Sequence, residues 1–331
     1  MDPIILNYVN ENDFAEAARA LLKNQKRNWK QLFEGYESLK KVKTKSFPFN
    51  GFEIKVQHNP KRFVSSSAKV DIKSVKEREC FLCRENLPEA QKGILYENEF
   101  VILGNPFPIF PEHFTISYIN HIPQRVENSF YQLLLLAKEL SKYYTVFYNG
   151  PECGASAPDH LHFQAGSKNF MPVENGFNQL KKKYGDVLLE KESITITIID
   201  DGLRRFLSFE SREIEILKRS FDIFYKTYKE FSKSEIEPMM NILSVYDNES
   251  MWRVLIFLRE KHRPSFFYEK GEKNFLWSPA AVDLGGVCII PKEENFNNIS
   301  RDIIISGFNQ TTLSTDRLLL IKENLKQSYS V

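Results

Sequence analysis

Apolar residues recur at three- and four-residue steps near the start of the chain. This spacing places them on one face of a helix, and Asp13, at the start of the pattern, belongs to a residue type that caps helices. The pattern predicts a helix over residues 13–39 with polar outer faces. The apolar positions are Phe14, Ala17, Ala18, Leu21, Leu22, Trp29, Leu32 and Phe33.

Residues 40–79 are rich in lysine and serine and contain one short alternating segment. Single polar residues separate Phe52, Ile54 and Val56, and this period of two is typical of a strand with one buried face. We expect one strand here and loops in the rest of the segment.

Short apolar runs and one helical pattern follow the cysteine pair at Cys80 and Cys83. Leucine and phenylalanine spacing predicts a helix within residues 127–144, and residues 160–165 alternate polar and apolar positions without a break. Strands are predicted at residues 93–96, 100–103, 113–118, 145–148 and 160–165.

The second half of the chain repeats this order of strands and helix. A helix is predicted at residues 213–231. Because the strands are grouped around single helices, the order favours an α+β fold with antiparallel sheets and flanking helices. The predicted strands are residues 193–199, 203–209, 242–246, 253–258 and 282–290.

The repeated order of predicted strands and helix suggests two fused α+β units. We expect residues 1–175 to form a catalytic half with an N-terminal helical extension. Residues 176–331 would form a second half that is non-catalytic or binds substrate, because the histidine pair of the first half has no counterpart there.

Composition narrows the classes of function. Of 331 residues, 42% are hydrophobic and 27% charged, which is ordinary for a globular protein with a buried core. The 45 basic residues nearly balance 43 acidic ones, so a broad positive field for duplex nucleic acid is not expected, whereas a small anionic substrate is compatible. No signal-peptide pattern or membrane-spanning run occurs, so we expect a cytoplasmic protein without membrane contact.

His160, His162 and Gln164 carry the strongest chemical signal. Residues two apart in a strand share one face, which leaves Leu161 and Phe163 on the other. A neutral imidazole is a good nucleophile, so His162 could attack phosphorus and form a phosphoramidate, while the Gln164 amide donates to a phosphoryl oxygen. The alternative is a surface strand in which two histidines alternate by chance.

The loop before this strand has the composition of a phosphate-binding loop. Residues 148–156 read Tyr-Asn-Gly-Pro-Glu-Cys-Gly-Ala-Ser, and the backbone amides of such small residues can surround an anion. Many ordinary turns have a similar composition.

Cys80 and Cys83 have the spacing of two ligands of a tetrahedral zinc ion. His121 and His160 are candidates for the other two ligands, and a zinc ion bound by His160 would fix the strand that carries His162. Two alternatives remain: a redox-active pair, which requires a helix that begins at the first cysteine, and two free buried thiols.

Other candidates have weaker signals. His113 could contact the phosphate or be a core histidine that bonds to backbone. For the cluster Arg259, Lys261, His262 and Arg263, a solvated loop is favoured over contact with an anion. Cys153 and Cys288 are expected to be packing residues.

The segment Asp159-His160-Leu161-His162-Phe163-Gln164 resembles the His-x-His-x-Gln signature of the galactose-1-phosphate uridylyltransferase branch of the histidine triad superfamily. The amino-acid sequence of this motif, HLHFQA, is most similar to that of GDP-L-galactose phosphorylases. Residues 105–117 and 150–156 are similar instead to diadenosine tetraphosphate phosphorylases. The resemblance covers residues 78–170.

Several roles follow from this resemblance. It implies that His162 is the nucleophile and that Gln164 holds the phosphoryl group. It also implies that Asn149 contacts the phosphate, with Gly154 and Ser156 in the same loop. The implied ligands of a structural zinc ion are Cys80, Cys83, His121 and His160.

The resemblance implies a nucleotidyltransferase or phosphorylase that forms a covalent histidine–nucleoside monophosphate. Its substrate would be a nucleoside diphosphate sugar or a dinucleoside polyphosphate, and phosphate or a sugar phosphate would be the acceptor. A hexose-1-phosphate uridylyltransferase and a non-catalytic nucleotide-binding protein are the alternatives. A homodimer is compatible with the sequence.

Overall fold

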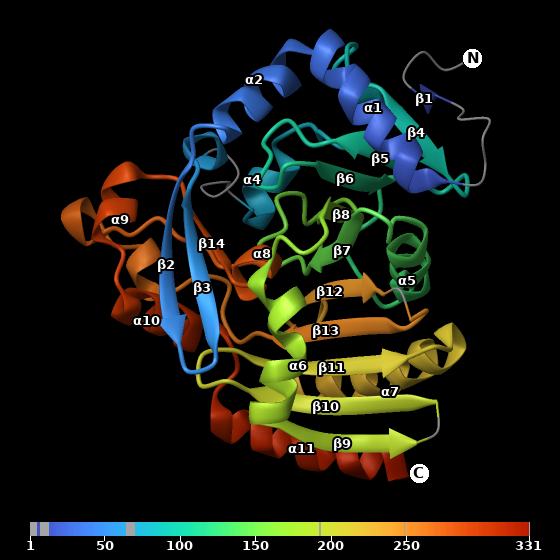
Figure 1. The fold of residues 1–331 in the computed structure, drawn as a ribbon, viewed down its shortest axis with the longest axis vertical. Helices are drawn as coiled ribbons and strands as arrows, with labels where there is room; N and C mark the ends of the chain where they lie inside the picture. Colours follow the sequence, from blue (N-terminus) through green and yellow to red (C-terminus); the bar gives the residue numbers. More distant parts are fainter. Residues whose placement is uncertain (1–4, 7–12, 64–69, 192, 248, 331) are drawn as a thin grey trace.

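A long sheet forms the centre of the computed structural model (Figure 1). The structure describes residues 5–6, 13–63, 70–191, 193–247 and 249–330. Neighbouring strands of this sheet run antiparallel, except that β1 is parallel to β4. In sheet order the strands are β1 (Ile5–Leu6), β4 (Gly93–Tyr96), β5 (Phe100–Gly104), β6 (His113–Tyr118), β8 (His162–Ser167), β7 (Tyr144–Asn149), β12 (Met240–Tyr246), β13 (Trp252–Leu258), β11 (Arg205–Ser211), β10 (Ile194–Asp200) and β9 (Gly185–Lys191).

A smaller sheet and a set of helices surround the long sheet. β2 (Lys43–Phe49) and β3 (Phe52–His58) form an antiparallel hairpin, and β3 also pairs in parallel with β14 (Val287–Ile290). The helices are α1 (Phe14–Asn28), α2 (Lys30–Leu39), α4 (Ile72–Lys76), α5 (Phe130–Glu139), α6 (Pro172–Tyr184), α7 (Ile214–Ser232), α8 (Ala281–Leu284), α9 (Glu293–Asn298), α10 (Arg301–Thr311) and α11 (Thr315–Ser330). The predicted α+β fold with antiparallel strands and flanking helices is therefore confirmed.

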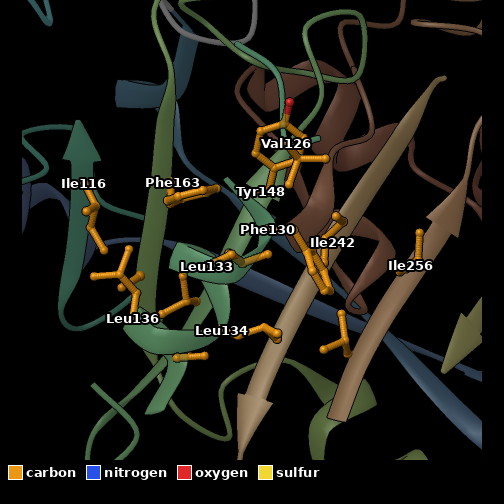
Figure 2. Packing of buried hydrophobic residues seen from close by; sticks show 14 of the residues in the cluster. Ile116, Val126, Phe130, Leu133, Leu134, Leu136, Tyr148, Phe163, Ile242 and Ile256 are labelled. Carbon is orange, nitrogen blue, oxygen red and sulfur yellow. The ribbon is translucent and has the colours of Figure 1, made fainter. Parts of the chain in front are cut away.

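One face of the long sheet packs against α1, α5, α7 and α11. Phe163 of β8 and Tyr148 of β7 are buried in this core together with Phe130 and Leu133 of α5 (Figure 2). The Phe130 ring stacks on Phe221 of α7 at 3.7 Å between centroids. Successive side chains of a strand point to opposite faces of the sheet, so the residues between these core positions face the other side.

The opposite face carries a second core and the candidate site. α6 and the small sheet cover the strands from the second half, and α6 lies across them in Figure 1. Phe147 of β7 and Leu243 of β12 belong to this second core. Near β7 and β8 the covering is incomplete, and a cavity opens there.

The predicted helix over residues 13–39 is two helices. Asp13 caps α1 by accepting a hydrogen bond from the Glu16 amide at 3.0 Å, as expected. The helix ends because Trp29 has an extended backbone, with φ −127° and ψ 102°. Its side chain is buried and lines the cavity, so tertiary packing overrides the helical pattern here.

Three other segments differ from expectation. β2 lies in residues 40–79, where only the strand at Phe52 was predicted. The strand expected over residues 160–165 begins at His162, so His160 precedes it. Residues 282–290 divide into the end of α8 and β14, because Gly286 has a φ of +106° and turns the chain between them.

The two halves of the chain share one sheet. β7 pairs with β12 in the register Asn149 to Asn241, so the strands from the two halves meet edge to edge. The expected boundary between residues 175 and 176 lies within α6, which leads from one part of the sheet to the other.

The expectation of no signal peptide rests on residues 1–22, of which residues 1–4 and 7–12 lie outside the described residues. In the described part of the chain, no helix has both the length and the apolar composition needed to cross a bilayer.

Two glycines in helices test the packing of the second core. A Cβ atom at Gly307 of α10 would lie 2.2 Å from Cζ3 of the buried Trp277, whereas one at Gly176 of α6 would meet nothing within 4 Å. Gly307→Ala should therefore lower the free energy of unfolding by about 1–3 kcal/mol, because overpacking outweighs helix propensity. Gly176→Ala should raise it by about 0.5–1 kcal/mol.

Urea denaturation of both variants measures this difference. A Gly307→Ala protein as stable as the Gly176→Ala protein would contradict the packing described for Trp277.

Candidate active site

A cavity of about 620 Å³ lies beside β7 and β8 on the face opposite α5. Its wall contains apolar side chains such as Trp29, Phe81 and Leu103, and residues from both halves of the chain contribute. We call it the central cavity. Charged and polar side chains also line it, among them Arg62, Arg78, Asn149, Ser156, His162, Gln164, His262, Arg263 and Asp283.

Strand alternation explains why β8 brings His162 and Gln164 to this cavity. Phe163 and Ala165 are fully buried in the core of the opposite face. His162 is 5% exposed and lines the cavity, which excludes the alternative of a surface strand. His160 does not share this face, because it lies outside the strand and its ring turns toward Cys80 and Cys83.

The His162 ring is fixed in one tautomer. Its Nδ1–H donates to the backbone carbonyl of His160 at 2.8 Å, so Nε2 carries the lone pair. Burial lowers the pKa of His162 to about 4, so the imidazole is neutral at physiological pH. Gln124 holds the backbone, since its Oε1 accepts from the His162 amide at 2.7 Å and its Nε2 donates to the His162 carbonyl at 3.0 Å.

His113 orients the side-chain amide of Gln164. The Ile109 amide donates to Nδ1 of His113 at 3.2 Å, so the ring proton lies on Nε2, which donates to Oε1 of Gln164 at 3.0 Å. The Gln164 NH₂ group therefore faces the cavity as a donor. His113 is fully buried, and burial together with the Arg62 charge lowers its pKa to about 3. His113 lies behind Gln164 and is not among the cavity-lining residues.

A second amide, that of Asn149, is oriented in the same way. Its Oδ1 accepts from Nδ2 of Asn241 at 2.8 Å and from the Ala281 amide at 2.9 Å. Donors from the second half of the chain thus occupy both acceptor positions of Oδ1. The NH₂ group of Asn149 remains to donate into the cavity that Asn149 lines.

The glycine of the small-residue loop is required by close packing. Gly154 has a φ of +96° and its Cβ would lie 2.6 Å from Cβ of Ala280, so a side chain is excluded. Gly154 and Ser156 both line the cavity, as does Arg78, which donates to the Ser156 carbonyl at 3.4 Å. The loop thus passes directly along the wall of the central cavity.

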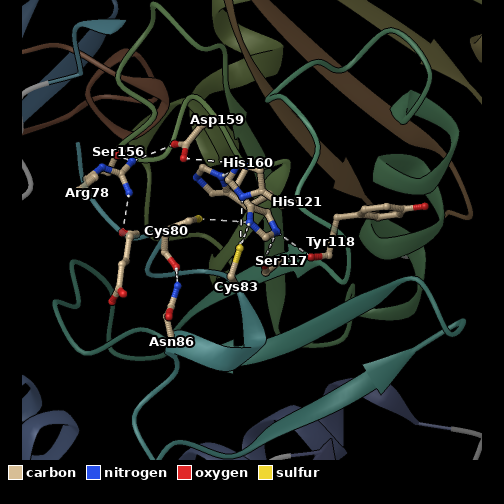
Figure 3. A network of polar contacts seen from close by, with 12 residues as sticks. Arg78, Cys80, Cys83, Asn86, Ser117, Tyr118, His121, Ser156, Asp159 and His160 are labelled. Carbon is tan, nitrogen blue, oxygen red and sulfur yellow. Dashed lines mark hydrogen bonds and ion pairs between the residues drawn. The ribbon is translucent and has the colours of Figure 1, made fainter. Parts of the chain in front are cut away.

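The four predicted metal ligands come together in one cluster (Figure 3). The ligand atoms of Cys80, Cys83, His121 and His160 all lie within 4.8 Å of one another. Nδ1 of His160 is 3.3 Å from Sγ of Cys80 and 3.6 Å from Sγ of Cys83, and Nδ1 of His121 is 3.2 Å from Sγ of Cys83. Tetrahedral zinc with usual bond lengths separates sulfur and nitrogen ligands by about 3.6 Å, so the donor set fits this ion.

The surroundings of the cluster also suit a metal. Nε2–H of His160 donates to the Tyr118 carbonyl at 2.8 Å, which leaves the Nδ1 lone pair facing the thiols. Asp159 lies 3.8 Å from Nε2 of His121 and pairs with Arg78 at 2.8 Å. A short 3-10 turn, Arg84–Asn86, follows Cys83. The helix that a redox-active pair requires is therefore not formed at Cys80.

Arg62 is a site residue that sequence reasoning missed. It ends the 3-10 turn Pro60–Arg62 that follows β3, and it lines the cavity. Its Nη1 donates to the Phe107 carbonyl at 3.1 Å, and its Nε is buried without a hydrogen-bond partner among the described residues. Burial lowers its pKa to about 10. Nothing in the lysine-rich segment 40–79 distinguishes Arg62 before folding.

The basic cluster after β13 is not the solvated loop that the sequence favoured. Arg259 is 2% exposed, and His262 and Arg263 line the central cavity. Lys261 alone is exposed. Cys153 and Cys288 are fully buried, in agreement with their prediction as packing residues.

Comparison with known proteins relates the chain to a family model and to solved structures. Residues 21–167 match the model of DUF4922, a domain of unknown function. No curated protein matches the chain.

The crystal structure of yeast Ap4A phosphorylase Apa2 is similar, with a TM-score of 0.58 and 16% identity over 88% of this chain and 97% of that one. The Ap4A complex of Apa2 has the same values. For its AMP complex the TM-score is 0.56 with 16% identity, over 88% of this chain and 96% of that one. At this identity the likeness shows the fold alone: the chain shares the α+β fold of Apa2.

The hydrogen bonds around His162 and His113 predict their protonation states. Both rings should be neutral at about pH 6 because their buried environment opposes a positive charge. The proton should lie on Nδ1 of His162 and on Nε2 of His113. Long-range ¹H–¹⁵N spectra of the histidine rings, assigned with His162→Gln, distinguish these tautomers. An imidazolium signal from His162 at this pH would contradict the geometry described.

Proposed function

We propose that this chain is a nucleotidyltransferase that transfers a nucleoside monophosphate group through His162. The observation that carries the proposal is the bond from Nδ1–H of His162 to the His160 carbonyl. It leaves the Nε2 lone pair of a neutral imidazole in a cavity lined by two oriented amides, those of Gln164 and Asn149. The likeness to Ap4A phosphorylase in fold supports the same activity class.

In the first step Nε2 of His162 attacks the α-phosphorus of a nucleoside diphosphate sugar or a dinucleoside polyphosphate. A nitrogen–phosphorus bond forms, and the bond from phosphorus to the bridging oxygen breaks, with its electron pair leaving on that oxygen. The ring becomes positively charged, and the His160 carbonyl stabilises it through Nδ1–H.

The amides and the small-residue loop stabilise the phosphoryl oxygens. Charge grows on these oxygens in the transition state, and donors that are already oriented stabilise it without reorganisation. Gln164 and Asn149 supply side-chain NH₂ groups, and the backbone near Gly154 borders the same space. His113 acts only through Gln164, whose carbonyl oxygen it holds.

In the second step an acceptor oxygen attacks the same phosphorus atom. The nitrogen–phosphorus bond breaks, and its electron pair returns to Nε2, so His162 is neutral again. Phosphate as acceptor releases a nucleoside diphosphate, and a sugar phosphate releases a nucleoside diphosphate sugar.

Zinc held by Cys80, Cys83, His121 and His160 would serve a structural purpose. Bound there, it would fix the ring of His160, whose backbone carbonyl orients His162. The chemistry of the transfer itself is assigned to the side chains of the cavity.

Intact-mass analysis tests the covalent step. Incubation with dinucleoside polyphosphates or nucleoside diphosphate sugars, without acceptor, should add one nucleoside monophosphate group to the chain. His162→Gln keeps a side chain of similar size and should form no adduct. Gln164→Ala should slow adduct formation by about 10²- to 10³-fold, because one oxyanion donor is lost.

The pH dependence of adduct formation gives a further check. Because the pKa of His162 is about 4, the rate should be constant near neutral pH and fall only when acid protonates Nε2. An adduct on His162→Gln, or no adduct from any nucleotide, would refute the proposal.

Metal content tests the zinc site. The purified chain should contain one zinc ion, and Cys80→Ser should lose it and lower the melting temperature, because metal binding is coupled to folding. Cys153→Ser is the matched control, since Cys153 is also buried but lies outside the cluster. Zinc retained in Cys80→Ser, or lost in Cys153→Ser, would contradict the assignment.

A further inference from the structure

Two buried side chains of the second half lie behind the Asn149 amide. Asn241 of β12 is the partner of Asn149 in the register with β7 and is fully buried. Arg259, the residue after β13, is 2% exposed. Neither is among the described residues that line the central cavity, whereas Asn149 is. Any effect of Asn241 or Arg259 on a ligand in the cavity must therefore pass through a neighbouring residue.

Hydrogen bonds connect these three side chains in series. Nη1 of Arg259 donates to Oδ1 of Asn241 at 2.7 Å. Nδ2 of Asn241 donates to Oδ1 of Asn149 at 2.8 Å and to the Cys153 carbonyl at 2.7 Å. Both N–H donors and the oxygen of the Asn241 amide thus have partners within the protein.

The donor and acceptor roles in this series have one consistent assignment. A guanidinium donates and never accepts, so the side of Asn241 that faces Arg259 must be its oxygen. The Cys153 carbonyl only accepts, so the side that faces it must be the NH₂ group. A rotated Asn241 amide would place donor against donor and acceptor against acceptor in a buried position, where unpaired polar groups are costly.

The same reasoning fixes the orientation of Asn149. Its Oδ1 accepts from Asn241 and, at 2.9 Å, from the Ala281 amide. Both of these partners can only donate at this position, so the oxygen of Asn149 faces the second half of the chain. The NH₂ group is the part of the amide that faces the central cavity.

Arg259 is itself held so that its donors have fixed positions. Besides the bond to Asn241 it donates four more, at 2.8 to 3.0 Å, and all four go to backbone carbonyls. Rotation of the guanidinium would break several of these bonds at once. The carbonyls belong to Lys261, His262, Pro279 and Thr311.

We propose that Asn241 and Arg259 are positioning residues of the proposed reaction. They hold the Asn149 amide with its NH₂ group toward the phosphoryl oxygens of the nucleotide. Asn241 also holds the Cys153 carbonyl, and with it the loop that continues to Gly154. The inference rests on the proposed function for its effect on the rate of transfer, whereas its effect on nucleotide binding can be measured separately.

Asn241→Asp is the most direct variant. It keeps an oxygen for Arg259 and replaces the NH₂ group by a second oxygen. This oxygen faces Oδ1 of Asn149 and the Cys153 carbonyl, so Asn149 should turn its own oxygen toward the cavity. The variant therefore removes a donor from the cavity without a change in any residue that lines it.

Equilibrium binding is the first measurement. Titration calorimetry with AMP, GMP, CMP and UMP identifies the monophosphate that the chain binds. For that nucleotide, Asn241→Asp and Asn149→Ala should each raise the Kd at least about tenfold, because each removes a hydrogen bond to a charged phosphate.

The rate of adduct formation on His162 is the second measurement. At saturating nucleotide, both variants should form the adduct at least about 10²-fold more slowly, since one donor to the phosphoryl oxygens is lost in each.

A double-mutant cycle shows whether Asn241 acts through Asn149. In the Asn149→Ala background, Asn241→Asp should change the Kd and the rate at least about tenfold less than it does in the wild type, because the donor that it positions is already absent. A new negative charge near the cavity, or a general loosening of the structure, would act by the same factor in both backgrounds. If Asn241→Asp does not fold, Asn241→Ala serves for the same cycle.

Ser244→Ala is the matched control. Ser244 also lies on β12 and is 1% exposed, and its Oγ has no hydrogen-bond partner among the described residues. Its loss removes a buried polar atom from the same strand but leaves the series intact. The Kd and the rate should equal those of the wild type.

The outcomes separate the two proposals. If a monophosphate binds but no nucleotide forms an adduct, the proposed function fails, and the cycle in Kd decides the positioning role. If adducts form but the factors in the cycle are independent of background, the positioning role is refuted while the proposed function stands. Wild-type behaviour of Asn241→Asp, or an equal loss in Ser244→Ala, would refute the positioning role as well. A chain that neither binds a monophosphate nor forms an adduct would refute both.

Discussion

The hydrogen bond between Nδ1 of His162 and the carbonyl of His160 is the constraint on which the site depends. It spans only two residues, at 2.8 Å, so it holds only if the backbone at His160 cannot rotate. The ring of His160 provides this restraint, because it lies between Cys80 and the Tyr118 carbonyl. The cluster of candidate metal ligands and the orientation of the His162 ring thus depend on the same short stretch of backbone.

Burial determines the chemistry of the charged and polar groups around this bond. It keeps His162 neutral, with its pKa lowered to about 4, so the ring needs no separate base to become a nucleophile. The same burial leaves Nε of Arg62 without a hydrogen-bond partner among the described residues, which carries a free-energy cost. The cavity is therefore lined by a neutral imidazole and by a guanidinium whose Nε has no hydrogen-bond partner among the described residues.

The features that the sequence predicted are local ones. Alternation along β8 pointed to His162 and Gln164, and the spacing of Cys80 and Cys83 pointed to two of the four clustered residues, since these signals arise within a few residues. The break at Trp29 and the role of Arg62 could not be predicted in this way. Both depend on contacts between segments far apart in the chain, and neither residue differs locally from its neighbours in a helical or a lysine-rich segment.

The continuous sheet explains why a second half without a histidine pair is part of the site. Asn149 ends β7 in the first half, and its amide is oriented by Asn241, its partner in register on β12. Asn241 is held in turn by Arg259, which also fixes the backbone that carries His262. One buried arginine of the second half therefore connects the residue that orients Asn149 to the backbone of His262, which also lines the cavity. The second half thus contributes to the candidate site by orienting Asn149 and by lining the cavity, and neither contribution requires a histidine pair of its own.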